Sequence, residues 1–182
     1  MREDETRTLV ERCLHAFPAA KLPKLTPEMI DRARATQLTS LWAGCGAVYK
    51  IDIETASAKS HQTLTIVAKR VDMPERCDSI GDQRKKKSYD HEAAFYSKGH
   101  ARRLIAAGAK VPFPLHVEPA SRGANVTIVM THLDGRPTHA GGDEAFVKWV
   151  AILHATYWGE RAAGACGEGG LQPQGTYWHL DT

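Results

Sequence analysis

Two glycines, a valine and a lysine stand at spacings that suit a phosphate-binding turn followed by a strand. Gly44 and Gly46 lie between two strand-like runs, Val48 follows, and Lys69 comes directly after the apolar run 66–68. Glycine lets the backbone approach an anion and turn N–H groups toward it. Valine can cover a base or ribose, and lysine supplies a compact positive charge. This set predicts a site for the phosphates of a nucleotide.

The same residues also have a purely structural interpretation. A Gly-x-Gly turn is typical of a tight hairpin that needs a positive φ. Lys69 precedes Arg70, so the two side chains point to opposite faces of a strand and Lys69 could be the outward one. Burying an ammonium group without a partner is costly, however, so a lysine in an apolar strand should have one. Both interpretations stay open at this point.

A carboxylate partner for Lys69 is expected on the helix that follows its strand. Glu92 lies among small and aromatic residues, which fits a helix packed on a sheet. Paired with Lys69, it would hold the ammonium group toward the phosphates. Asp90 is the competing partner, and a solvated helix position is the structural alternative for Glu92.

Other groups that could carry chemistry are interpreted as structural. The basic run 84–87 is typical of a solvated first helical turn. Three histidines lack the spacing of metal ligands; they are His132, His139 and His154. His179 and Asp181 form a His-x-Asp pair, but the metal-binding Asn that follows such a pair in a catalytic loop is missing, because the chain ends one residue after Asp181.

Periodicity and turn residues predict the elements that would position these residues. We expect helices over 6–17, 27–35, 84–107 and 143–158, and strands over 36–42, 45–53, 63–71, 115–118 and 125–130. Gly99 weakens the third helix in its middle. Residues 72–83 are expected to form a loop, and the chain after Gly159 is expected to be glycine-rich coil.

Composition bounds the class of protein. The 182 residues are 42% hydrophobic and 25% charged, which is ordinary for a soluble globular protein. The formal net charge of +3 does not indicate a nucleic-acid partner or a membrane surface, and no apolar run has the length of a membrane span. The four cysteines are widely separated, which predicts reduced thiols in a cytoplasmic protein.

In this order, these residues resemble the N-terminal lobe of the kinase-like small-molecule phosphotransferases. Within that superfamily the likeness is to the ecdysteroid-kinase-like, choline-kinase-like and aminoglycoside-phosphotransferase-related proteins. It rests on the segments 44–50, 67–69, 89–96, 128–133, 152–155 and 175–182. It implies an α+β fold: a five-stranded antiparallel sheet with a long αC-type helix, then a hinge and the first helix of a truncated C-lobe. The domains would be a helical extension (1–35), the kinase-like N-lobe (36–133) and the hinge with a partial C-lobe (134–182).

The resemblance implies roles by position. The glycines would cover the phosphates of ATP, the lysine would contact them, and the glutamate would hold the lysine. Backbone groups from Thr131 to Leu133 would meet the adenine edge. The implied nucleotide-binding set is Gly44, Gly46, Val48, Lys69, Glu92, Thr131 and Leu133. Mg²⁺ and a small-molecule acceptor are implied only for a full-length form, and the acceptor is not identified.

The departures from the family pattern bear on activity. The family's catalytic Asp and its metal-binding Asn and Asp belong to a C-terminal lobe that this chain lacks. Phosphoryl transfer depends on positioning and on neutralisation of charge by metal ions. We therefore expect weak nucleotide binding and no turnover from this chain alone. The alternatives are a non-catalytic binding or regulatory module, a pseudokinase fragment, and an unrelated α+β domain in which the glycine turn and the lysine coincide by chance.

The helix expected over 143–158 generates a first prediction. Its apolar side chains Phe146, Val150, Leu153 and Trp158 would enter the larger lobe of the family fold. Without that lobe they should be partly uncovered and should drive self-association. Sedimentation velocity should therefore show oligomers, whereas a stable, monodisperse monomer would contradict the expectation.

Overall fold

A computed structural model describes residues 1–55, 62–73, 78–119, 125–135 and 144–173. The chain divides into two compact units. The first comprises 1–77 and 114–132, and the second comprises 78–113 and 133–182. The expected α+β class with a five-stranded antiparallel sheet is confirmed.

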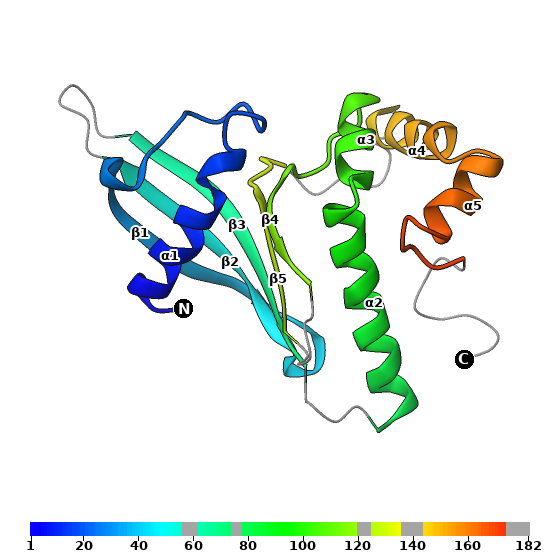
Figure 1. Ribbon diagram of the computed structural model, residues 1–182, viewed down its shortest axis with the longest axis horizontal. Helices are drawn as coiled ribbons and strands as arrows, with labels where there is room; N and C mark the ends of the chain where they lie inside the picture. Colours follow the sequence, from blue (N-terminus) through cyan, green and yellow to red (C-terminus); the bar gives the residue numbers. More distant parts are fainter. Residues whose placement is uncertain (56–61, 74–77, 120–124, 136–143, 174–182) are drawn as a thin grey trace. The chain divides into compact units, whose positions relative to one another are not determined.

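The first unit is a sheet with one N-terminal helix against it (Figure 1). Its elements are α1 (Glu3–Cys13), short 3-10 helices at Leu14–Ala16, Pro27–Met29 and Trp42–Gly44, and the strands β1 (Ile30–Ser40), β2 (Gly46–Thr55), β3 (Gln62–Asp72), β4 (Pro114–Glu118) and β5 (Asn125–Thr131). The strand order is β1-β2-β3-β5-β4, so β3 is the central strand.

The alternation of side chains along β2 and β3 decides which face of the sheet α1 covers. Ile51 and Ile66 are fully buried register partners, and partners in register share a face. Arg70 lies four positions from Ile66, so its side chain is on the same face. Because Arg70 forms an ion pair with Glu5 of α1, this is the face that α1 covers. Phe17, which follows α1, is also fully buried.

The helix predicted over 27–35 is wrong, because β1 begins at Ile30 after a short 3-10 turn. In the pairing of β1 with β2, Arg32 lies opposite Glu54, while Ala33 is buried. Opposite charges across a strand pair stabilise a sheet, and this pairing outweighs the helix propensity of alternating Arg and Ala. Residues 30–35 of the expected helical extension therefore belong to the sheet, and the first strand starts before residue 36.

The other four strands match their predicted bounds to within two residues at each end. Their alternating or continuous apolar patterns leave little ambiguity about whether each segment is a strand or a helix. Cys13 and Cys166 carry free thiols, as predicted. Cys77, His139 and residues 179–181 lie outside the described part of the chain.

The second unit is helical within its described residues. It contains α2 (Ile80–Ser97), α3 (His100–Ala106), α4 (Glu144–Thr156) and α5 (Glu160–Cys166). The single helix predicted over 84–107 is wrong, because Gly99 adopts a left-handed φ of 85° and separates two helices. The loop predicted over 72–83 is too long, since Ser79 caps α2 by accepting from the Asp82 N–H at 3.0 Å.

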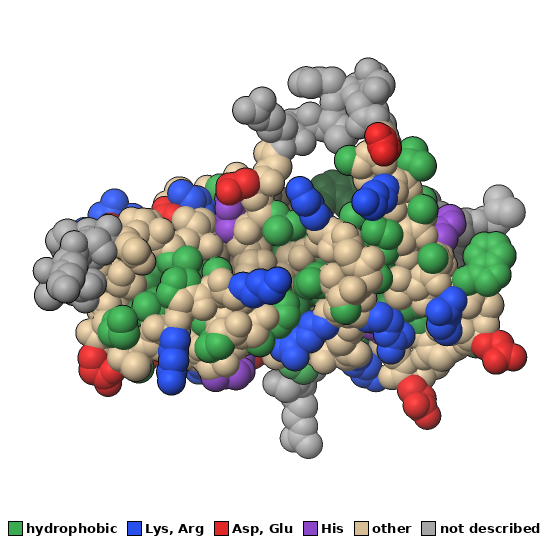
Figure 2. Space-filling view, turned by 90° about the horizontal axis from the view of Figure 1, so that it is seen from above, with side chains coloured by type: hydrophobic (Ala, Val, Ile, Leu, Met, Phe, Trp, Pro, Cys, Tyr) green, Lys and Arg blue, Asp and Glu red, His purple; other side chains and the backbone are tan. Residues whose placement is uncertain are grey.

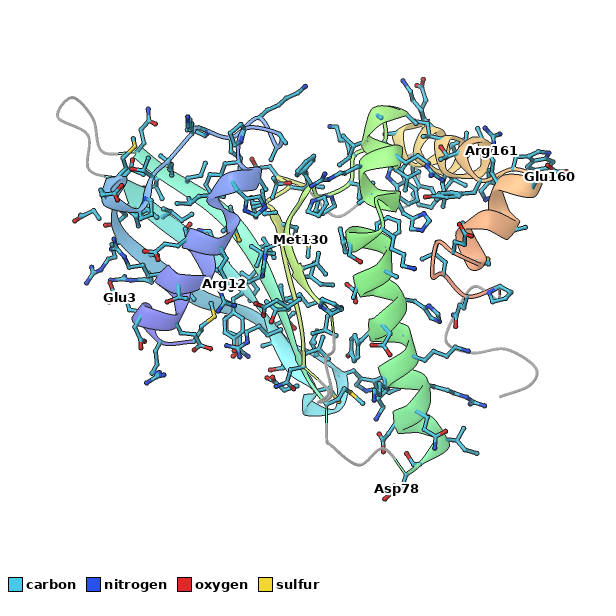
Figure 3. All side chains as sticks on the ribbon, viewed as in Figure 1. Glu3, Arg12, Asp78, Met130, Glu160 and Arg161 are labelled. Atoms are coloured by element: carbon cyan, nitrogen blue, oxygen red, sulfur yellow. The ribbon has the colours of Figure 1, made fainter. Side chains whose placement is uncertain are left out.

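The expected coil after Gly159 contains α5, which begins near the end of α4. Arg161, labelled in Figure 3, donates through Nη2 to the carbonyl of Ala155 at 2.9 Å. A cation at a helix C-terminus satisfies carbonyls that have no partner within the helix. A capping contact between residues six positions apart leaves no periodic pattern in the sequence, so α5 was not predicted.

The core of the second unit joins α3 to α4. Leu104 and Ala101 are fully buried, and the α4 side chains packed around this cluster are Trp149, Ile152 and Leu153. The buried stripe of α4 is therefore rotated from the predicted one. Phe146 is 59% exposed and Trp158 73% exposed, as expected, whereas Val150 and Leu153 are half-buried. Hydrophobic side chains also reach the surface in Figure 2.

Two histidines hold the turn after α5. His100 is 3% exposed, and its Nδ1 and Nε2 lie 2.8 Å from the Tyr157 hydroxyl and 2.9 Å from the Gly169 carbonyl oxygen. A carbonyl only accepts, so Nε2 carries a proton, and in the neutral ring Tyr157 donates to Nδ1. His91 donates from Nδ1 to the Gly170 carbonyl at 2.7 Å. The spacing of these histidines in the sequence did not indicate this network.

The His100 network predicts a stability effect. His100→Leu should leave the Tyr157 hydroxyl and the Gly169 carbonyl without their partner, and should lower the free energy of unfolding by about 2–4 kcal/mol. Urea denaturation followed by circular dichroism measures this change. His100→Gln, which retains a donor and an acceptor, should recover part of the loss. Equal stability of the wild type and His100→Leu would contradict the structural role of the network.

Candidate functional site

The glycine turn joins β1 to β2 and is held by hydrogen bonds of its own. The Gly44 N–H donates to the Leu41 carbonyl at 3.2 Å, and the Cys45 N–H donates to the Trp42 carbonyl at 3.4 Å. The Leu41 N–H donates to the Gly46 carbonyl at 2.8 Å. Two N–H groups of the turn are thus engaged internally, and an anion bound here would compete with these hydrogen bonds.

Glycine is favoured at positions 44 and 46 for different physical reasons. Gly44 has a φ of 71° and Gly46 a φ of 117°, both of which disfavour other residues. A Cβ on Gly46 would lie only 2.1 Å from the Arg70 carbonyl oxygen, so close approach to β3 requires this glycine. A Cβ on Gly44 would meet nothing within 4 Å. Packing therefore explains Gly46, while the open space at Gly44 is compatible with an approaching ligand.

Lys69 lies in the central strand and shares a face with apolar neighbours. The register places Val48 of β2 and Ile128 of β5 on either side of it. Lys69 is half-buried and Ile128 is fully buried. Arg70 points to the opposite face, toward α1. The lysine and the arginine therefore serve two different faces of one strand.

A polar group that sequence analysis did not single out lies on the Lys69 face of the sheet. Lys50 Nζ is 3.0 Å from Asp52 Oδ2, and the Thr65 hydroxyl donates to Asp52 Oδ1 at 2.7 Å. Burial raises the pKa of Asp52, but the hydrogen bonds from Thr65 and Lys50 outweigh it and the net pKa is lowered. Lys50 and Asp52 are two residues apart on β2, so they share a face, and the register with β3 places Thr65 opposite Asp52. This combination of spacing and register is the signal that would have located the polar group.

The predicted site residues are divided between the two units. Five of them belong to the first unit: Gly44, Gly46, Val48, Lys69 and Thr131. Glu92 and Leu133 belong to the second. Glu92 is half-buried in α2, one turn before Tyr96, and Leu133 is 45% exposed. The ion pair of Lys69 with Glu92 stays a prediction.

Tyr96, which follows Glu92 by one helical turn, has a perturbed pKa. Burial raises the pKa of Tyr96 to about 12, and the charge of Glu92 adds to this effect. Among the described residues, no group of three or more His, Cys, Asp and Glu side chains could hold a metal ion. The site as described consists of apolar strand surface with lysines and one hydrogen-bonded carboxylate.

Comparisons with protein-family models, curated proteins and solved structures find no match to this chain. The structure itself defines an α+β protein with a five-stranded antiparallel sheet. No helix within the described ranges has both the length and the apolar character needed to cross a membrane.

The unequal environments of the two glycines predict unequal substitution effects. Gly46→Ala should lower the free energy of unfolding by about 3 kcal/mol or more, because its Cβ meets backbone that cannot withdraw without breaking the β2–β3 pairing. Gly44→Ala, the matched control, should cost only about 1–2 kcal/mol from its φ. Thermal and urea denaturation measure both values, and equal losses would show that the contact with Arg70 is not the constraint.

Proposed function

We propose that this chain is the ATP-binding portion of a small-molecule kinase, a phosphotransferase that in its full-length form acts on an alcohol group. The observation that carries the proposal is the position of Lys69 in the central strand of the sheet. It lies beside Val48, which follows the glycine turn, on the face of the sheet opposite α1. Half-burial among apolar neighbours favours a lysine that serves a ligand over one that only solubilises a surface.

Each residue of the proposed site has a distinct task. Val48 and Ile128 offer apolar surface to the base and ribose, while the ammonium group of Lys69 contacts the phosphates. The open space at Gly44 admits the phosphate oxygens, with some rearrangement of the turn's hydrogen bonds. Glu92 is proposed to hold Lys69, and backbone groups of Thr131 and Leu133 are proposed to meet the adenine edge.

We propose that Mg²⁺ and the small-molecule acceptor bind only to a full-length form of the kinase. Mg²⁺ bound to ATP would neutralise charge on the phosphoryl group during transfer. The Asp52 carboxylate is already engaged by Lys50 and Thr65, so it is a poor candidate for a metal ligand. The residues of this chain are therefore proposed to bind and orient the nucleotide.

A second candidate is a non-catalytic binding or regulatory module. The exposure of Phe146 (59%) and Val147 (63%) on α4 favours it, because large apolar side chains gathered on one helix commonly mark an interaction surface. The engagement of Gly44 and Cys45 N–H groups within the turn points the same way. For this second candidate, self-association through α4 is the simplest interaction.

A nucleotide titration tests the ATP proposal. Binding of a fluorescent ATP analogue, with and without Mg²⁺, should weaken about tenfold in Lys69→Met, because a charge-assisted contact to phosphate is lost. Lys50→Met is the matched control, since it removes a lysine of the same face that pairs with Asp52. Its affinity should stay within about twofold. No saturable binding, or equal losses in both variants, would overturn the proposal.

A double-mutant cycle tests the role proposed for Glu92. If Glu92 acts by holding Lys69, then Glu92→Gln should weaken binding of the analogue in the wild type but have little further effect in Lys69→Met. Additive losses would show that the two residues act independently. Asp90→Asn serves as the control for the competing partner, and its affinity should remain that of the wild type.

A further inference from the structure

A cavity of about 380 Å³ lies between α1 and the sheet, entirely within the first unit. This volume falls in the range of small-molecule sites. Its floor is formed by side chains of β3, β5 and β4, and its roof by α1. It opens on the face of the sheet that carries Arg70, so it is separate from the proposed nucleotide site around Lys69.

The floor and the roof have matching dimensions. Arg70, Thr127 and Glu118 are successive register partners, so they stand side by side, and the two strand spacings separate the ends by about 10 Å. Glu5 and Arg12 are seven residues apart on α1, which is also about 10 Å. Glu5 pairs with Arg70, and Arg12 pairs with Glu118. Arg12 is labelled on α1 in Figure 3. The two ion pairs therefore lie about 10 Å apart along the cavity.

The lining is strongly charged and carries both signs. Its charged groups are the Met1 amino group, three arginines and three acids, and these side chains are Arg2, Arg12, Arg70, Asp4, Glu5 and Glu118. The hydrogen bond from Arg70 lowers the pKa of Glu5. Burial raises the pKa of Glu118, but His116 and Arg12 outweigh it, so its net pKa is also lowered. Both carboxylates are thus charged at neutral pH.

Both ion pairs leave capacity for a ligand. Arg70 and Arg12 each use one terminal nitrogen in their ion pairs, and a guanidinium has five N–H donors. The side chains of the pairs are 30–53% exposed, and ion pairs of this kind are individually weak, so a ligand can exchange with them at low cost. Leu9, which is 8% exposed, adds an apolar contact in the roof.

We propose that this cavity binds a compact zwitterion, a molecule with one carboxylate and one ammonium group joined by a short carbon chain. The carboxylate meets Arg70 and the ammonium group meets Glu118, with the Thr127 hydroxyl between them. A simple anion would face the Glu5 and Glu118 carboxylates, and a simple cation would face the guanidinium groups. Only a ligand that carries both charges can pair with a guanidinium group and with a carboxylate of the lining at the same time, because each ion pair presents both signs to the cavity.

Three molecules of similar length test the proposal: 6-aminohexanoate, hexanoate and hexylamine. Isothermal titration calorimetry on the full chain should show 6-aminohexanoate binding about tenfold more tightly than either singly charged analogue. Arg70→Gln and Glu118→Gln should each weaken its binding about tenfold. Arg32→Gln is the matched control, because it removes an ion pair to Glu3 of α1 that does not line the cavity. It should leave the affinity within about twofold.

Several outcomes would overturn the assignment. They are equal affinity for all three molecules, no saturable binding of 6-aminohexanoate at millimolar concentration, and equal weakening by Arg32→Gln. Circular dichroism of each variant establishes that its fold is intact. Lys69→Met should bind 6-aminohexanoate like the wild type, so failure of this site and failure of the nucleotide site are distinguished by the same set of proteins.

Discussion

The register between β2 and β3 is the constraint on which the first unit depends. It runs without irregularity from Gly46 opposite Val71 to Thr55 opposite Gln62. At its start, the Gly46 backbone lies so close to the Arg70 carbonyl that no side chain fits, and the Asp72 N–H donates to the Cys45 carbonyl at 3.0 Å. A slip of one residue would move every side chain to the other face. The register therefore assigns a face to each charged group of β3.

The pairing of β1 with β2 is less regular, and this difference fits the positions of the two strands. It contains register shifts between Ile30 and Arg32 and between Gln37 and Thr39. Bulges are common at sheet edges, where they bend a strand and interrupt its pairing. Since β1 is an edge strand, its irregularity leaves the central strands unchanged. The proposed nucleotide site rests on these central strands, and the cavity beneath α1 rests on β3 and β5 together with Glu118 of the other edge strand, β4.

The sequence was sufficient to predict an element where its type and position follow from the local residue pattern. Because neighbouring residues of a strand point to opposite faces, the sequence predicted that Lys69 and Arg70 would face opposite ways, and the apolar run 125–130 predicted a strand. Prediction from the sequence failed where contacts with a distant part of the chain determine the type or the bounds of an element. The strand from Ile30 depends on the charges of β2, and α5 depends on contacts with the end of α4. The requirement for Gly46 arises from a carbonyl 24 positions away, which no local pattern encodes.

The opposite orientation of Lys69 and Arg70 has a consequence for how this protein tolerates change. A codon gained or lost inside β3 would exchange the two cations between the faces, and would do so for every downstream residue of the strand. Point substitutions, by contrast, alter one face at a time. Evolutionary length variation should therefore be found in the connections between strands, and β3 itself should vary only by replacement.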